Sequence, residues 1–424
     1  MLVHCIELSG GVIAQKGSNT ATIRIVASLA DVPKDPVSQD ALGFAASAER
    51  LAEHFALGLT VFTRSVRYYQ LVAAGIRIAA EAGVADPRDV VLRLERTWAL
   101  ASYLADKAAG DRSGSGLLGI TYVRSAAEAA KARQELDYPL FQRGSQGRAG
   151  ALGLYRRSAH NLLLLDAGSV TSLGQRLSDT FVADVESSGL RPAALVRVKS
   201  TSSTALRDFG RKAGLFAAID RHTAEAAWDA LSNDVNRRAA AKTLRNGRQS
   251  QDALLARLGG TPRFRVQASA AVALEQTYAA LSRPLDAAVE VASQAGSVEP
   301  SEIRRSPALL DVLDDWKARA QQAVEDLERG GVDHELVDLG RRVAEAHHPW
   351  EAVEILVDRH RRVQEAKGRP PWLDWRGGHL VRAAATPNPG YRPFDLASAP
   401  RGHDFRLLNL RGLAREIAAA GVAL

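Results

Sequence analysis

The stretch LGLYRRSAHNLLLLDAGSVTSLGQRLSD, residues 152–179, decides the fold class of this chain. At about 100° per residue, its first half places four polar side chains on one arc of a helix: Arg156, Arg157, His160 and Asn161. The opposite arc is apolar and carries Tyr155, Ala159, Leu162 and Leu163. One polar and one apolar face are typical of an amphipathic helix that packs against a core.

A second helix is expected after a tight stop. Gly168 is placed to end the first helix as its C′ residue, and Ser172 with Gln175 has the spacing of a capping box. Apolar residues then recur every four positions, at Leu173, Leu177, Phe181 and Val185. The pattern predicts the outline of a helix-turn-helix or winged-helix segment, in which a basic helix enters the major groove.

Two features of the same segment count against DNA reading. Only five residues, Asp166 to Val170, precede Thr171, which leaves no room for a full β-wing. The second helix also carries acidic residues that would repel phosphate, namely Asp179, Asp184 and Glu186. The competing interpretation is a solvated face on a helix packed in a bundle.

Helical spacing continues through most of the chain, so we predict a mainly α fold. It is a multi-helix bundle with a helix-turn-helix-like segment, a small N-terminal β unit and a C-terminal β-hairpin turning at Gly377-Gly378. A length of 424 residues predicts more than one packed unit. We expect a small β unit and linker at 1–40, a helical domain with the helix-turn-helix-like segment at 41–188, a basic helical region at 189–265, an acidic helical bundle at 266–365, and the hairpin with a closing helix at 366–424.

The composition is that of a soluble globular protein, with 46% hydrophobic and 24% charged residues. No apolar run is long enough for a transmembrane helix, and Glu7 interrupts the short apolar start of a chain without a basic leader. Cys5 is the single cysteine, which excludes an internal disulfide and a multi-cysteine zinc site. We therefore expect a bacterial cytoplasmic protein without membrane contact.

The net charge of +7 and a pI near 9.6 favour an acidic partner such as nucleic acid. Residues 190–265 hold 15 Lys and Arg against 6 Asp and Glu, whereas residues 296–365 hold 16 acidic against 10 basic residues. The basic block and the acidic block could face each other or two different partners.

Basic residues at three- and four-residue steps in 237–248 suit tracking of a phosphate backbone. Tyr and Trp are sparse in this block, so base stacking is not indicated there. The alternative is a solvated basic face, or one that pairs with the acidic helices. The predicted nucleic-acid contacts are Arg143, Arg148, Arg156, Arg157, Asn161, Arg237, Arg238, Lys242, Arg245 and Arg248.

No motif predicts catalysis. There is no phosphate loop, dinucleotide fingerprint, nucleophile elbow or kinase signature. His347 and Glu351 have metal-ligand spacing but flank Pro349, the pair His403-Asp404 lacks a nucleophile at a supporting spacing, and Glu365-Ala366-Lys367 is expected to end a helix. We predict no metal site and no cofactor, and the lack of a catalytic motif favours a protein without enzymatic activity. A nuclease or hydrolase with a dispersed site stays open as an alternative.

Two segments resemble an uncharacterised family of bacterial proteins found near mobile elements and anti-phage defence genes. They are DALGFAASAERLAEHFALGLTVFTRSVRYYQL (40–71), and DYPLFQRGSQGRAGALGLYRRSAHNLLLL (137–165) followed by VTSLGQRL. Leu57-Gly58 stands where the family pattern has Pro-Gly. The resemblance carries over no catalytic residue, and it implies a subunit of a defence or genome-maintenance assembly.

The leading hypothesis is a non-enzymatic subunit of such a complex that contacts nucleic acid. A second is a protein-binding scaffold, in which the acidic helices and the tail with Trp372 and Trp375 dock other subunits. For these two tryptophans the alternative is packing of the hairpin itself.

Overall fold

The computed structural model describes residues 40–109, 117, 120, 123–124, 127, 150–190, 203–247, 250–295, 297–304, 307–382 and 403–424. Except for Asp40, the expected β unit at 1–40 lies outside these residues. The described chain is mainly helical with two small antiparallel sheets, which confirms the predicted fold class. No helix in these ranges is both long and apolar enough to span a membrane.

The chain divides into two compact units, and the division falls inside α1 (Ala45–Ala56) and α13 (Arg265–Ala295). Unit 1 comprises residues 1–46 and 273–402, and unit 2 comprises residues 47–272 and 403–424. The C-terminal hairpin and the closing helix, which the sequence places in one segment, therefore belong to different units.

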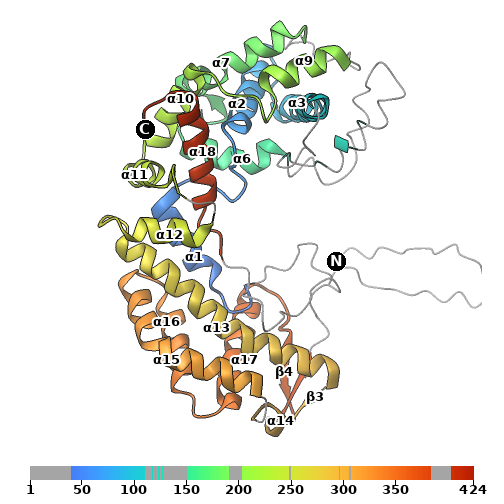
Figure 1. The fold of residues 1–424 in the computed structure, drawn as a ribbon. Helices are drawn as coiled ribbons and strands as arrows, with labels where there is room; N and C mark the ends of the chain where they lie inside the picture. Colours follow the sequence, from blue (N-terminus) through green and yellow to red (C-terminus); the bar gives the residue numbers. More distant parts are fainter. Residues whose placement is uncertain are drawn as a thin grey trace, which may run out of the picture. The chain divides into compact units, whose positions relative to one another are not determined.

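Unit 2 holds most of the described helices (Figure 1). Besides α1, these are α2 (Val66–Glu81), α3 (Arg88–Ala108), α6 (Ala151–Asn161), α7 (Ser172–Ser187), α9 (Ser203–Ala213), α10 (Arg221–Ser232), α11 (Val235–Leu244), α12 (Gln251–Gly259) and α18 (Leu407–Ala419). The strands β1 (Leu165–Asp166) and β2 (Ser169–Val170) form a short hairpin between α6 and α7.

The core of unit 2 is built around α2, which contacts α3, α6 and α7 and is buried on almost every side. The Tyr68 ring lies 5.0 Å from the Trp98 ring and 4.9 Å from the Tyr155 ring. On α9, a Cβ at Gly210 would lie 2.0 Å from the carbonyl oxygen of Ala101, so only glycine lets α9 approach α3 this closely.

Two carboxylates, the half-buried Glu416 and the buried Glu95, cap helices of unit 2 from distant parts of the sequence. Glu416 on α18 accepts hydrogen bonds from the Val66 amide at 3.0 Å and the Ser65 hydroxyl at 3.2 Å, at the start of α2. Glu95 accepts from the Ala151 amide at 2.8 Å, at the start of α6. Negative charge is favourable at these helix ends, but burial raises the pKa of Glu416 and raises the pKa of Glu95 to about 7.

Unit 1 contains α14 (Pro300–Arg304), α15 (Pro307–Arg329), α16 (His334–Glu345), α17 (Pro349–Ala366) and most of α13. Its sheet has the order β3-β5-β4, with β3 (Ser297–Val298), β4 (Leu373–Arg376) and β5 (His379–Arg382). Arg376 pairs with His379 across Gly377-Gly378, so the predicted hairpin turn is confirmed. The third strand, β3, is too short to leave a period-2 pattern in the sequence.

His360 on α17 joins two further segments of unit 1. It is buried, its Nδ1 lies 3.1 Å from the Ala41 carbonyl oxygen, and its Nε2 accepts from the Trp372 amide at 2.9 Å. Because Nε2 is an acceptor, the ring is neutral with its proton on Nδ1. The Trp372 ring lies 4.8 Å from the imidazole, and the Trp375 ring lies 4.7 Å from that of Trp350. Trp372 is buried, which confirms the packing interpretation for this residue, whereas Trp375 is half-buried against Trp350.

Candidate nucleic-acid interface

Residues 152–179 fold as a helix, a tight stop and a second helix, but the caps of the two helices differ from those expected. Leu163, and not Gly168, is the left-handed residue after α6, with φ of 59°, while Gly168 lies in the β1–β2 turn. Thr171, one residue before the expected Ser172, caps α7, because its hydroxyl accepts from the Gly174 amide at 3.1 Å. Between the two helices, β1 and β2 form a miniature hairpin with two residues in each strand, which is much shorter than a β-wing.

The polar face of α6 is exposed as predicted, and its four residues are Arg156, Arg157, His160 and Asn161. Arg156 borders a small cavity of about 190 Å³ together with Arg88 and Glu95. Leu163 was expected on the apolar arc, yet it lies beyond the helix and is 56% exposed. The left-handed conformation of Leu163 turns the Leu163 side chain away from the core.

Asn161 lies against the turn between α1 and α2. A Cβ at Gly58, where φ is 78°, would lie 2.4 Å from the Asn161 Cβ. Tyr155, farther back on α6, donates to the Phe62 carbonyl and accepts from the Arg64 amide at 3.1 Å. One side of α6 therefore runs along residues 58–64 of this turn.

The buried position of Arg237 corrects one predicted contact. Only 1% of its surface is exposed, and its guanidinium donates to the carbonyls of Leu57, Ala230 and Leu231 and to the Asn233 side chain. Arg237 lies on the inner face of α11, so it cannot reach a phosphate while the unit is folded. A periodic count of arginines could not distinguish this inner position from the outer ones.

The outer face of α11 retains Arg238 and Lys242, which are four residues apart and exposed. The Lys242 Nζ lies 6.0 Å from the centre of the Trp228 ring, a cation–π distance. Arg245, one turn farther, is half-buried. Arg143, Arg148 and Arg248 lie outside the described residues.

Two further arginines from neighbouring elements bind α11. The Arg257 Nε on α12 donates to the Thr243 carbonyl, and the Arg263 Nε donates to the Asn236 side chain at 2.8 Å. Both side chains are exposed. We call Arg238, Lys242, Arg257 and Arg263 the α11–α12 basic face. Arg257 and Arg263 lie in the basic block at 190–265, but nothing in the sequence predicts that they lie beside α11.

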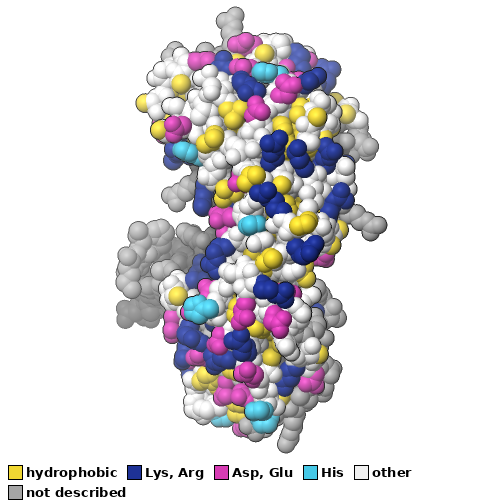
Figure 2. All heavy atoms as spheres, turned by 90° about the vertical axis from the view of Figure 1, so that its left-hand side faces the viewer, with side chains coloured by type: hydrophobic (Ala, Val, Ile, Leu, Met, Phe, Trp, Pro, Cys, Tyr) yellow, Lys and Arg dark blue, Asp and Glu magenta, His cyan; other side chains and the backbone are white. Residues whose placement is uncertain are grey.

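The charges of the α11–α12 basic face are not neutralised by neighbours. In the described part of the chain, no ion pair links any of its four cations to a carboxylate. Arg221 of α10, in contrast, lies 2.8 Å from Glu225. Figure 2, seen from the side on which α10–α12 lie in Figure 1, shows Lys and Arg side chains gathered over these helices.

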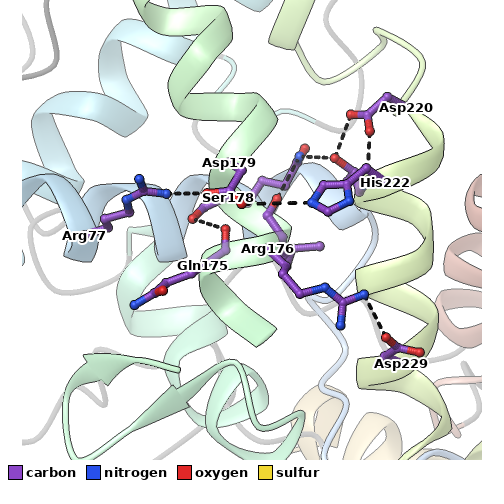
Figure 3. A network of polar contacts seen from close by, with 11 residues as sticks. Arg77, Gln175, Arg176, Ser178, Asp179, Asp220, His222 and Asp229 are labelled. Carbon is purple, nitrogen blue, oxygen red and sulfur yellow. Dashed lines mark hydrogen bonds and ion pairs between the residues drawn. The ribbon is translucent and has the colours of Figure 1, made fainter. Parts of the chain in front are cut away.

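A groove of about 710 Å³ borders the hairpin on another side of unit 2. Its charges form a network of pairs (Figure 3): Arg77 lies 2.6 Å from Asp179 and Arg176 lies 3.0 Å from Asp229. His222 lies 4.0 Å from the second oxygen of Asp179. Asp179, which was expected to repel phosphate, is thus neutralised, but so are both arginines. The groove offers little net charge to an anion.

The candidate catalytic residues of the sequence have structural partners. Glu351 accepts from the His347 amide at 2.8 Å, and Asp404 accepts from the Arg406 amide at 2.6 Å. Lys367 follows the end of α17, as expected. Among the described residues, no three His, Cys, Asp or Glu side chains gather as metal ligands.

Comparisons with protein families, curated proteins and solved structures find no match to this chain. The class of protein therefore has to be inferred from the α11–α12 basic face and the surfaces around it.

Proposed function

We propose that this protein binds nucleic acid through its phosphate backbone and that it does so without chemistry of its own. One observation carries the proposal: four exposed cations, two on α11 and two from α12 and the segment before α13 that bind α11, gather around this helix, and in the described residues no ion pair neutralises them. Such a surface attracts a polyanion and releases its counterions on binding. Arg156 and Arg157 on α6 are additional candidate phosphate contacts.

The cellular context is part of the same proposal. The sequence resemblance supports a cytoplasmic subunit of a bacterial anti-phage defence or genome-maintenance complex that works with other proteins. Purification of the tagged protein from its own host tests this part. Recovery as a lone monomer would count against it.

Binding is measured by fluorescence anisotropy with a labelled 20-base-pair duplex and the matching single strand. We expect binding at about 50 mM salt and a steep loss toward about 200 mM, as for other backbone contacts. The variant R238E/K242E should weaken binding by at least about tenfold and reduce the salt slope by about two, since each lost phosphate contact removes about one unit.

The matched control is R211E/R221E, which changes the net charge equally. Arg211 and Arg221 already lie 3.8 Å and 2.8 Å from the carboxylates of Asp208 and Glu225. This variant should retain near wild-type affinity. Absence of binding by the wild type at about 50 mM salt, or an equal loss in both variants, would overturn the proposal.

A further inference from the structure

The turn between α1 and α2, residues 57–64, exposes three apolar side chains. Leu57 is 45% exposed, Val61 is 37% exposed and Phe62 is 43% exposed. Leu163, which follows α6, and Val235, the first residue of α11, are 56% and 60% exposed. Large apolar side chains grouped on a surface are characteristic of a binding site.

This turn is held in place by side chains from three other elements. Arg237 of α11 donates to the Leu57 carbonyl, Asn409 of α18 donates to the Thr60 carbonyl at 2.9 Å, and Tyr155 of α6 donates to the Phe62 carbonyl. Within the turn, the Thr63 hydroxyl donates to the Thr60 carbonyl at 2.7 Å. The backbone around Phe62 is therefore preorganised, which reduces the entropy lost when a ligand binds.

Exposed arginines lie in the turn and on the two helices, α6 and α11, that bind it. Arg64 lies in the turn, Arg157 shares a face of α6 with Asn161, and Arg238 follows the residue that binds Leu57; all three arginines are exposed. Asn161 lies against Gly58, which is in the same turn as Phe62. An aromatic ring among cations is the composition of surfaces that bind single strands, where bases stack on rings while cations hold the phosphates.

We propose that Phe62 stacks on an unpaired base of single-stranded nucleic acid whose phosphates Arg157 and Arg238 hold. The inference rests on the proposed function and specifies its substrate class. The bases of an intact duplex are already stacked on each other, so Phe62 has no free base face to contact there. Phe62 lies outside the basic block at 190–265, in which Tyr and Trp are sparse and base stacking is not indicated.

The test compares Phe62 variants in binding to labelled (dT)20 and to a mixed-sequence duplex of about equal length. Stacking predicts that Phe62→Ala weakens (dT)20 binding by roughly 5- to 100-fold and leaves duplex binding nearly unchanged. Phe62→Tyr keeps the ring and should bind (dT)20 like the wild type. Phe62→Leu keeps apolar volume without a planar ring and should behave like Phe62→Ala. Leu408→Ala, at a position 39% exposed on α18, is the control and should bind normally.

Salt dependence separates this inference from the proposed function. Loss of a stacked ring lowers affinity without changing the salt slope, whereas R238E/K242E lowers the slope. If Phe62→Ala binds (dT)20 like the wild type while R238E/K242E does not, the stacking inference is wrong and the proposed function stands. Wild-type affinity of Phe62→Leu for (dT)20 would also overturn stacking. If the Phe62 variants lose affinity for (dT)20 while R238E/K242E binds like the wild type, the proposal that the α11–α12 basic face holds the phosphates is wrong.

Discussion

The guanidinium of Arg237 donates a hydrogen bond to the main-chain carbonyl of Leu57, a residue 180 positions earlier in the chain. The bond fixes the start of the exposed turn to α11. Arg238, the next residue, points outward and is exposed. Two adjacent arginines therefore have opposite roles, one in stability and one on the candidate binding surface.

Arg237→Ala should destabilise unit 2 by roughly 3 kcal/mol or more. The substitution leaves the carbonyls of Ala230 and Leu231 without their donor, and each buried unsatisfied group costs about 1–3 kcal/mol. Arg238→Ala is the matched control and should stay within about 0.5 kcal/mol of the wild type. Urea denaturation followed by circular dichroism measures both. Equal midpoints for the two variants would contradict the assignment.

Gly58→Ala should destabilise unit 2 more than Gly83→Ala. Both glycines have positive φ, 78° and 66°, which costs an alanine about 1–2 kcal/mol. Only at Gly58 would the new Cβ also meet the Asn161 Cβ, whereas nothing lies within 4 Å at Gly83. Overpacking adds roughly 1–3 kcal/mol. The double variant G58A/N161G removes that contact and should recover the difference; failure to recover would show that backbone strain alone is responsible.

Glu95→Gln should stabilise unit 2 above pH 7 and have little effect near pH 4.5. Between the ordinary pKa of 4.5 and its folded pKa of about 7, Glu95 binds more protons in the folded than in the unfolded state. Stability therefore falls as pH rises through this window, by at most about 3 kcal/mol. Gln keeps an acceptor for the Ala151 amide and carries no charge. Melting temperatures at pH 5 and pH 8 test this, and a variant that gains equally at both would exclude titration of Glu95.

Unit 1 should respond to pH in the opposite direction. Burial, with a smaller contribution from Lys367, lowers the pKa of His360 from 6.5 to about 4. Between these values the unfolded chain binds a proton that the folded chain does not, so stability falls as pH drops from about 6.5 to about 4, by at most about 3 kcal/mol. Hydrogen exchange of the backbone amides of β4 and α17, measured at pH 7 and at pH 5, should show this loss of stability as weaker protection at pH 5.

His360→Gln should flatten this pH response, because its amide can donate and accept without titrating. His334→Gln, at a side chain that is 95% exposed, is the control and should retain the wild-type response. A steep response that persists in His360→Gln would assign it to another group.

Periodicity predicted the fold class well because helix faces repeat within a few residues. The helices around Arg156 and Phe181 and the Gly377-Gly378 turn follow from local patterns. The candidate site is harder to predict from the sequence, because contacts between residues far apart in the chain decide which side chains face outward. Arg237 and Arg238 read alike in sequence, and nothing near Phe62 predicts that Tyr155 and Asn409 hold its turn in place.

The contact of α18 with the start of α2 has a consequence for the order of events during synthesis. Glu416 supplies the cap of a helix that begins 350 residues earlier. The central helix of unit 2 therefore leaves the ribosome long before its cap exists. Until α18 has been made, the Val66 amide and the Ser65 hydroxyl lack this carboxylate, and a nascent unit 2 exposes surface that the finished unit covers. Truncation before α18 should yield a chain that depends on chaperones.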